Sequence, residues 1–364
     1  MRIVVAPDKF AGTLSAVEAA AAITTGWHRR LPETEVLEVP MSDGGPGFVD
    51  VLHAALGGTL LAATVADPYG KPVPATILRV GDTAYVESAQ AVGLHLTAEP
   101  ERRPMVATSR GLGELVHSAI EDGATTVVIG AGGTATNDGG AGLLAALGAS
   151  AQGGALDKGP DGLAGVEAVD LDAARRTTAG VDLVLASDVD NQLLGLVGAT
   201  KTYGPQKGLT EEELLTADGR LQHFAELVDR KTASQKGAGA AGGIGYALLL
   251  LGAARRPGVE VVADAVDLAG QLHGADLVIT GEGAFDFSSR SGKVPYGVAQ
   301  IAAEQLVPCI ALAGRVLVGS REMRALGIEA AYSVVDRVGE ERALGEPAAA
   351  LADLAERVCR TWGR

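Results

Sequence analysis

In several places of this sequence, a short apolar segment is followed by Asp, Gly or Lys residues that could take part in catalysis or ligand binding. The first is residues 3–6, and Pro7, Asp8 and Lys9 follow it. An Asp in this position can hold a metal ion or accept a proton, and a Lys can anchor a phosphate. A strand-to-helix turn with a solvated Asp–Lys pair would give the same pattern, so both interpretations stay open for this segment.

A second segment of this kind is rich in glycine. Residues 40–47 read PMSDGGPG, with their carboxylate at Asp43. Glycines let the backbone turn tightly and aim N–H groups at an anion. Asp43 could therefore orient a substrate hydroxyl or a Mg²⁺ ion, or it could only cap a tight turn.

The strongest local signal is the loop at residues 130–140, which reads GAGGTATNDGG between an apolar strand and a predicted helix. Backbone N–H groups at a helix N-terminus beside glycines can cradle a phosphate. The loop matches neither the dinucleotide fingerprint nor the Walker A motif. We predict a phosphate or nucleotide site here, with tight strand–helix packing as the alternative. Its candidate ligand residues are Gly132, Gly133, Thr134, Thr136, Asn137, Asp138 and Gly139.

A fourth segment combines carboxylates with a lysine. Asp188, Asp190 and Asn191 follow the apolar strand at residues 182–186, and such oxygen donors suit a Mg²⁺ ion that bridges phosphates. Further along, Lys207 stands in the string GPQKG and could lie on the transferred phosphate. The alternative is that the Asp residues cap a loop and that Lys207 is solvated.

Two weaker clusters remain. Residues 237–245 read GAGAAGGIG and open an apolar helix, so either a nucleotide or a crowded helix packs there. Glu282 lies in the string TGEG after an apolar strand, with Asp286 and Lys293 downstream. This second cluster again places acid and base beside glycines.

Other kinds of chemistry find no support in the sequence. The six His lack the H-x-x-x-H spacing of a zinc site. No G-x-S-x-G motif occurs, and Cys309 and Cys359 stand outside glycine-rich loops, so no acyl-enzyme is predicted. The chain has 30 Lys and Arg against 45 Asp and Glu, a formal net charge of −15, and 4% aromatic residues. A nucleic-acid surface needs a basic stripe and stacking rings, so that class is excluded.

Alternating strands and helices must position these segments. The first seventy residues alternate strands at 3–6, 36–39 and 59–65 with helices at 14–27 and 48–56, which favours a parallel sheet. Ligands bind at the carboxyl ends of the strands in open sheets of this kind. The chain has 50 Gly among 364 residues, about double the usual share of roughly 7%. Many of them fall at these strand ends.

The middle of the chain has a different pattern. Residues 73–78 and 83–87 predict a hairpin and therefore a mixed sheet, and the strand–helix alternation returns from about residue 262. We predict an α/β protein of two domains. Residues 1–68 and 270–364 form a Rossmann-like or flavodoxin-like parallel-sheet domain, and a mixed-sheet α/β domain, residues 69–269, is inserted in it.

The sequence also predicts where the protein works. Its first residues form a strand rather than a signal peptide, and its longest apolar stretch, residues 246–254, is far below the ~20 residues that span a bilayer. We therefore expect a soluble, cytoplasmic protein that acts on a small molecule, with neither membrane nor nucleic acid as partner. The oligomeric state stays open.

The order of these motifs resembles the type I glycerate kinase family, the bacterial glycerate 2-kinases. The resemblance covers nearly the whole chain. The matching strings are APD at residues 6–8, SDGG at 42–45, TSRG at 108–111, GGTATNDGG at 132–140, YGPQKG at 203–208, the glycine-rich run at 237–245 and VITGEG at 278–283.

The resemblance implies phosphorylation of D-glycerate by ATP with Mg²⁺, at the 2-hydroxyl, to give 2-phosphoglycerate. As a hypothesis of mechanism, we expect the loop at residues 132–140 to hold ATP phosphates, and Asp188 and Asp190 to hold the Mg²⁺ ion. Further residues assigned to ATP are Gly239, Gly242, Gly243 and Glu282.

The roles of the charged residues stay open at this point. Lys207 or Lys9 would neutralise the transferring group. One of Asp8, Asp43 or Asp188 would accept the hydroxyl proton. The sequence does not choose among them.

Three positions depart from the family pattern. A Lys usually follows the Phe of the first motif, whereas Ala11 stands here and Lys9 precedes the Phe. Pro46 replaces a Glu, and Ala284 replaces an Arg. These changes motivate one alternative, a kinase for another small hydroxy acid. A second alternative, from a different class, is a regulator that binds a nucleotide or sugar phosphate without turnover.

Overall fold

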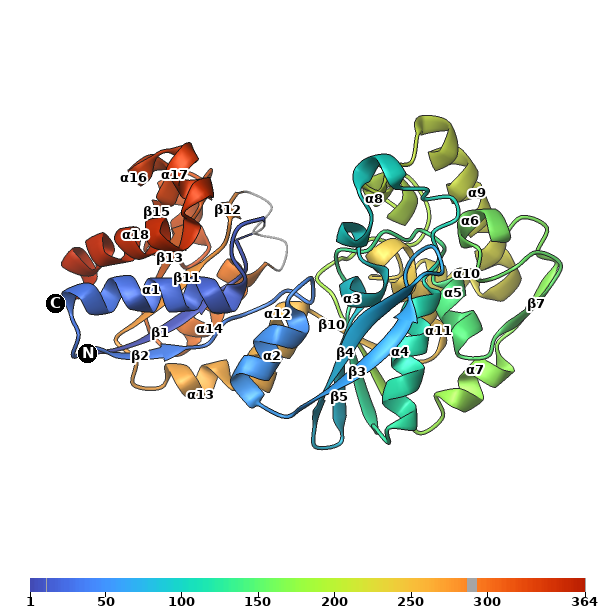
Figure 1. Ribbon diagram of the computed structural model, residues 1–364, viewed down its shortest axis with the longest axis horizontal. Coiled ribbons are helices and arrows are strands. Elements are labelled where there is room, and N and C mark those ends of the chain that lie inside the picture. The colour runs from blue at the N-terminus through green and yellow to red at the C-terminus, as the bar shows by residue number, and fades with distance from the viewer. Residues whose placement is uncertain (11, 287–292, 364) are drawn as a thin grey trace. The chain divides into compact units, whose positions relative to one another are not determined.

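The computed structural model describes residues 1–10, 12–286 and 293–363 (Figure 1). Across these residues the chain divides into two compact units. Unit 1 comprises Met1–Asp43, Asp50–Gly57 and Pro257–Arg364, and unit 2 comprises Gly44–Val49 and Gly58–Arg256. The helix α2 (Phe48–Leu56) begins in the segment that belongs to unit 2 and ends in the segment that belongs to unit 1.

Unit 1 is built on a sheet with the strand order β15–β13–β11–β1–β2, in which each neighbouring pair runs parallel. Numbered along the unit, this is the 2-1-3-4-5 order of flavodoxin-like sheets. The elements of unit 1 are β1 (Arg2–Pro7), α1 (Ala16–Arg30), β2 (Glu35–Glu38), α12 (Gly258–Ala265), α13 (Leu268–Leu272), β11 (Leu277–Gly281), β12 (Ala284–Phe285), α14 (Val294–Glu304), β13 (Cys309–Ala313), β14 (Arg315–Val316), α15 (Ser320–Ala325), β15 (Ala330–Ser333), α16 (Val334–Val338), α17 (Glu340–Gly345) and α18 (Pro347–Trp362).

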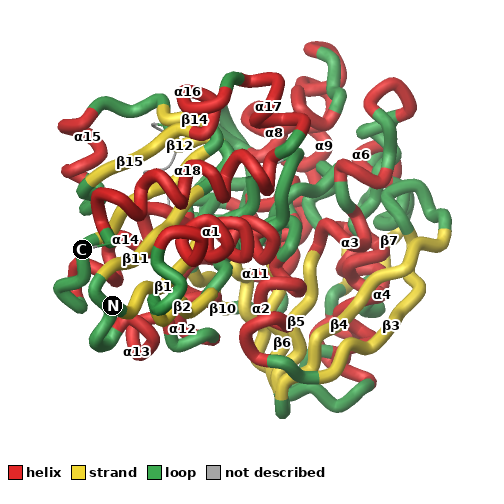
Figure 2. The backbone as a smooth tube through the Cα atoms, turned by 60° about the vertical axis from the view of Figure 1, so that its left-hand side comes forward, coloured by secondary structure: helices red, strands yellow, loops and turns green. Residues whose placement is uncertain are grey.

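The helices α1 and α18 lie side by side on unit 1 (Figure 2). Ser15 starts α1 with a capping box: its hydroxyl accepts a hydrogen bond from the Glu18 N–H, and the Glu18 carboxylate accepts one from the Ser15 N–H. A Cβ at Gly26 would lie 2.0 Å from the carbonyl oxygen of Ala352 in α18. The close approach of the two helices therefore requires glycine at this position.

Unit 2 is built on a mixed sheet with the strand order β10–β9–β6–β5–β4–β3. The pairs from β5 to β10 are parallel, and β3, β4 and β5 are antiparallel. The elements of unit 2 are β3 (Thr59–Ala66), β4 (Pro72–Val80), β5 (Thr83–Glu87), α3 (Ser88–Val92), the 3₁₀ turns Leu94–Leu96 and Glu99–Glu101, α4 (Arg110–Glu121), β6 (Thr126–Gly130), α5 (Ala141–Ala146), β7 (Ser150–Gln152), α6 (Gly159–Gly162), β8 (Ala168–Asp170), α7 (Asp172–Thr177), β9 (Asp182–Ala186), α8 (Ala199–Lys207), α9 (Glu211–Val228), α10 (Arg230–Ala233), the 3₁₀ turn Ala240–Gly242, α11 (Ile244–Leu250) and β10 (Ala254–Arg256).

The predicted fold class is confirmed: the chain is α/β, with a flavodoxin-like parallel sheet and a mixed sheet. One strand differs from expectation. We expected residues 59–65 as the third strand of a parallel sheet, but β3 pairs antiparallel with β4. The cause is a turn in which the Asp67 carboxylate accepts hydrogen bonds from the N–H groups of Tyr69 and Lys71, so that the chain reverses at once.

The expected division at residues 68 and 270 differs from the two units mainly in two elements. The strand β3 belongs to unit 2 because its hydrogen-bonded partner is β4, and α12 belongs to unit 1. None of the helices in the described ranges combines the length and the apolar character that crossing a bilayer requires.

Candidate functional site

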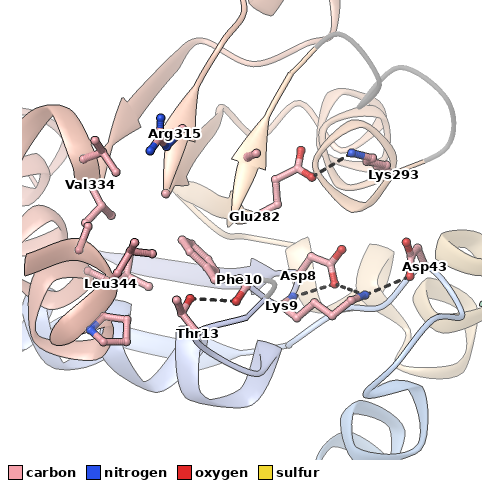
Figure 3. A pocket seen from close by; sticks show the side chains of 17 residues that line it. Asp8, Lys9, Phe10, Thr13, Asp43, Glu282, Lys293, Arg315, Val334 and Leu344 are labelled. Carbon is pink, nitrogen blue, oxygen red and sulfur yellow. Dashed lines mark hydrogen bonds and ion pairs between the residues drawn. The ribbon is translucent and has the colours of Figure 1, made fainter. Parts of the chain in front are cut away.

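The carboxyl ends of β1 and β11 carry the charged residues of unit 1. Asp8 follows β1, and Glu282 follows the neighbouring strand β11. The order of strands along the chain reverses between these two strands, and in open α/β sheets a ligand crevice forms at such a switch point. A cavity of about 410 Å³ opens there, with Asp8 and Glu282 in its lining (Figure 3).

Asp8 and Lys9 form the centre of the charged part of this cavity. The Nζ of Lys9 lies 3.5 Å from Oδ1 of Asp8 and 3.3 Å from Oδ1 of Asp43. Asp8 is only 6% exposed. The structure therefore brings together three of the predicted residues, two carboxylates on one lysine.

The protonation of this cluster follows from its burial. Burial raises the pKa of Asp8 to about 6; the charge of Lys9 opposes the rise and that of Asp43 adds to it. Burial alone would lower the pKa of Lys9, but Asp43 and Asp8 outweigh it and leave that pKa raised. Near neutral pH, Asp8 can therefore accept a proton while Lys9 stays charged.

A second acid–base cluster lies across the cavity. The Nζ of Lys293 is 3.7 Å from Oε2 of Glu282 and 3.9 Å from Oδ1 of Asp286. Glu282 is buried, and Lys293 stands directly before α14. Lys293 belongs to the weaker acid–base cluster noted in the sequence, whereas Arg315, which also lines the cavity, was not among the predicted residues. The signal that could have found Arg315 is its position just beyond the strand β13.

Lys207 is the central charge of a separate polar cluster, which lies in unit 2. It is the last residue of α8, not part of an open loop, and it is 3% exposed. Its Nζ donates hydrogen bonds to Oγ1 of Thr134, at 3.3 Å, and to the carbonyl oxygen of Thr136. Burial lowers the pKa of Lys207 to about 7, against the opposing charge of Asp138.

The loop at residues 130–140 is folded into unit 2. Asp138 is fully buried and accepts hydrogen bonds from the N–H and hydroxyl of Ser109 and from the N–H groups of Gly140 and Gly142. Burial raises the pKa of Asp138, and these hydrogen bonds oppose the rise. Asp138 thus holds the conformation of the loop from within.

Glycines let this loop pack against residues 237–245. A Cβ at Gly242 would lie 1.9 Å from the carbonyl oxygen of Thr136, and one at Gly243 would lie 2.4 Å from Cα of Gly139. A Cβ at Gly239 would be equally close to the backbone of Gln192. Close packing, the alternative considered from the sequence, accounts for these glycines.

Two buried polar atoms lie in the loop that Lys207 contacts. Within the described residues, Oγ1 of Thr136 and Oδ1 of Asn137 are buried without a hydrogen-bond partner. The Nδ2 of Asn137 donates to Oγ1 of Thr200 at 3.0 Å. Unsatisfied buried groups are costly, and a polar ligand is one way to satisfy them.

The two predicted metal ligands have different surroundings. Asp188 is half-buried just beyond the carboxyl end of β9. Asp190 is exposed, and its carboxylate pairs with Lys236 at 3.1 Å and Arg255 at 2.6 Å. Although partial burial would raise the pKa of Asp190, these two cations outweigh it and lower that pKa. A metal ion would have to displace both cations from Asp190.

The remaining predicted features lie as follows. In the part of the chain that the structure describes, no three His, Cys, Asp or Glu side chains form a metal-binding group. Pro46 lies near Gly133, whose Cβ would be 2.8 Å from the Pro46 ring, and Ala284 lines the cavity of unit 1. Ala11 and Gly292 lie outside the described residues.

Comparisons with known proteins agree with the resemblance in the motifs. The model of the glycerate kinase family matches residues 3–363. A glycerate kinase of Bacillus subtilis is 41% identical over 345 residues, which are 92% of this chain and 90% of that protein. A glycerate 2-kinase of Escherichia coli is 41% identical over 349 residues, 93% of this chain and 92% of that protein.

The fold agrees as well. The crystal structure of a protein from Salmonella typhimurium LT2, named as a glycerate kinase 2, superposes on this chain with a TM-score of 0.83. The two sequences are 38% identical, and the superposition covers 99% of this chain and 98% of the other. The match extends over both units and over every segment that carries the charged clusters. This chain belongs to the glycerate kinase family.

Proposed function

We propose that the protein transfers the γ-phosphoryl group of ATP to the 2-hydroxyl of D-glycerate and releases ADP and 2-phosphoglycerate. Membership of the glycerate kinase family supports ATP as donor and glycerate as acceptor. The relative from Escherichia coli, named a glycerate 2-kinase, supports the position of transfer. The observation that carries the proposal is the buried Asp8 carboxylate, paired with Lys9 in a cavity at the switch point of a flavodoxin-like sheet. Because ATP is the donor, we propose the cytoplasm as the place of the reaction.

Asp8 is the group we assign to the proton of the acceptor hydroxyl. In the transfer, the hydroxyl oxygen forms a bond to the γ-phosphorus, the bond from that phosphorus to the bridging oxygen of ADP breaks, and the proton goes to Asp8. A pKa near 6 leaves most of Asp8 ionised at neutral pH and still basic enough to help. Asp43, which holds Lys9 from the other side, acts as a positioning residue.

Lys9 supplies positive charge beside this carboxylate. The transferring phosphoryl group spreads its charge over three oxygens, and an adjacent ammonium neutralises that charge. The two carboxylates keep Lys9 protonated, since they raise its pKa. Asp8 thus serves as the base and also helps to keep the neighbouring Lys9 ammonium protonated.

In unit 2, we propose that Lys207 and Thr136 bind a phosphate group. The hydroxyl of Thr136 lacks a partner among the described residues, and the buried Lys207 ammonium donates to the carbonyl oxygen of the same residue. A phosphate oxygen would accept hydrogen bonds from both. Its negative charge would also favour the protonated form of Lys207, whose pKa burial lowers to about 7.

We propose Asp188 as the protein ligand of Mg²⁺. Magnesium sites in kinases commonly use one or two carboxylates together with substrate phosphates and waters, so one carboxylate is a sufficient anchor. When bound, the ion would neutralise charge on the phosphates. Asp190, the other predicted ligand, is a weaker candidate because Lys236 and Arg255 hold its carboxylate.

The substrate assignment predicts ATP-dependent turnover of D-glycerate in the presence of Mg²⁺. The rate is measured as ADP formation, and ³¹P NMR identifies the phosphorylated position. We expect 2-phosphoglycerate, and lower kcat/KM for other small hydroxy acids such as L-lactate and glycolate. If another hydroxy acid gives the highest kcat/KM, the changes at Pro46 and Ala284 have altered the acceptor. Absence of turnover with every acid would instead favour a regulator.

Asp8→Asn is predicted to lower kcat by about 10² to 10⁴, the range that general base catalysis supplies. The KM for ATP should change little, because the variant keeps the shape of the side chain. Asp43→Asn is the matched comparison: it removes one partner of Lys9 and leaves the base, so roughly a tenfold loss is expected. If Asp43→Asn proves the more damaging variant, the two roles are assigned in the wrong order.

Lys207→Met is predicted to raise the KM for ATP or D-glycerate by roughly tenfold or more, because a buried charge-assisted hydrogen bond to a phosphate or carboxylate is lost. Lys201→Met is the control on the same helix, where Lys201 pairs with Asp218 at 3.4 Å near the surface. The thermal midpoint of each variant checks folding. Equal KM values for the two variants would contradict a binding role for Lys207.

Asp188→Asn is predicted to raise the Mg²⁺ concentration for half-maximal rate by roughly tenfold, since a neutral amide is a poorer ligand for a hard cation. Asp190→Asn, its matched control, should leave that concentration near the wild-type value. The measurement is a Mg²⁺ titration at saturating ATP and D-glycerate. The reverse ranking of the two variants would show that Asp190 leaves its ion pairs to hold the ion.

A further inference from the structure

The cavity of unit 1 has an apolar part that the transfer step does not use. Its charged part, described above, lies around Asp8, Lys9 and Lys293. At the other end, the labelled lining side chains are Phe10, Val334 and Leu344, with Arg315 beside them (Figure 3). Thr13, Val335, Pro347 and Leu351 also line the cavity.

The chemistry of glycerate does not explain such a lining. Glycerate has three carbons, and each of them carries oxygen, so it offers no apolar group to the far end. The cavity, about 410 Å³, falls in the range of roughly 300 to 1,000 Å³ that holds drug-sized ligands. Of the two substrates proposed for this protein, ATP alone has a large flat apolar group, its adenine.

Residues from two parts of unit 1 line the apolar end of the cavity. Phe10 and Thr13 come from the turn between β1 and α1, which is closed by hydrogen bonds from the Leu14 N–H and the Thr13 hydroxyl to the Phe10 carbonyl. Val334 begins α16 directly after β15, and Leu344 lies in α17. Hydrogen bonds thus join Phe10 to Thr13 and Leu14 on one side of the apolar end, and residues of the C-terminal helices line the other side.

The exposure of Leu344 supports a ligand at this place. Its neighbours in the lining, Phe10 and Val334, are buried, whereas Leu344 is 59% exposed. A large apolar side chain at the mouth of a cavity gains free energy when a ligand covers it. Arg315, just beyond β13, pairs with Glu340 through its guanidinium, and the flat face of that group can still stack on an aromatic ring.

We infer that the apolar end of this cavity binds the adenosine of ATP, with the phosphate chain running toward Lys9 and Lys293. The inference rests on the proposed function, which makes ATP the donor. It assigns the nucleoside to unit 1, whereas most of the residues that the sequence suggested for ATP lie in the glycine-rich segments of unit 2. The phosphate site proposed at Lys207 is tested separately by its own variant.

Leu344→Ser tests this assignment without adding charge. The full-length protein is titrated with ADP and, separately, with inorganic tripolyphosphate in a calorimeter. We expect ADP binding to weaken roughly five- to tenfold, because part of an apolar contact is lost, and tripolyphosphate binding to stay within twofold. The KM for D-glycerate should also stay near the wild-type value.

Leu306→Ser is the matched control. Leu306 is 91% exposed and precedes β13, at the opposite end of that strand from Gly314 in the cavity. Its substitution should leave all three quantities unchanged. Leu344→Trp provides a second variant at the same site, which should change ADP binding through the cavity mouth even if the serine variant is less stable.

The outcomes separate this inference from the function on which it rests. Suppose that the wild-type protein phosphorylates D-glycerate, and that Leu344→Ser and Leu344→Trp both bind ADP as tightly as the wild type does. This result would keep the proposed function and overturn the inference. A raised KM for D-glycerate with unchanged ADP binding overturns it too, because the acid would then occupy this end. Selective loss of ADP binding supports it whichever acid proves to be the acceptor.

Discussion

The proposed catalysis depends on one buried carboxylate held beside one lysine at the end of a central strand. The backbone N–H of Asp8 donates to the Gly281 carbonyl at 2.8 Å, which ties the end of β1 to the end of β11. A Cβ at Gly281 would lie 2.0 Å from the carbonyl oxygen of Leu312, so glycine is required for the neighbouring strands to meet here. The sheet therefore fixes Asp8 where water is scarce, and scarcity of water is what raises its pKa.

The same constraint explains why the cavity has two chemically different ends. Around Asp8, burial is offset by opposite charges, and the cluster suits phosphoryl transfer. At the other end of the cavity, the buried side chains of Phe10 and Val334 form an apolar lining, which suits a nucleobase. A kinase must bind both the charged phosphate chain and the largely apolar nucleobase of one ATP molecule. The two ends of this cavity match these two groups. In unit 2, by contrast, Lys207 and Asp138 are ionisable groups buried in a packed region.

Much of the fold could be predicted from the sequence, because strands buried on both faces appear as short apolar runs. The strand β9 and the helix α2 have the predicted bounds. The sequence was a poor guide to side chains whose interaction partners lie far away along the chain. The pairs of Asp190 with Lys236 and Arg255 have no local signal. Leu344 resembles any apolar residue of an amphipathic helix, so the apolar end of the cavity was not predictable, while Asp8 and Lys9 were, because they stand directly after a strand.

The pH dependence of kcat/KM for D-glycerate tests the role of Asp8 most directly. A base with a pKa of about 6 predicts a rate that is constant near pH 7.5 and falls about tenfold per pH unit below pH 6, as the carboxylate takes up a proton. Because Asp43 raises the pKa of Asp8, Asp43→Asn should move this inflection to lower pH, and Asp8→Asn should abolish it. An inflection that persists unchanged in Asp8→Asn, or a wild-type rate that is flat from pH 5 to pH 7.5, would contradict the account.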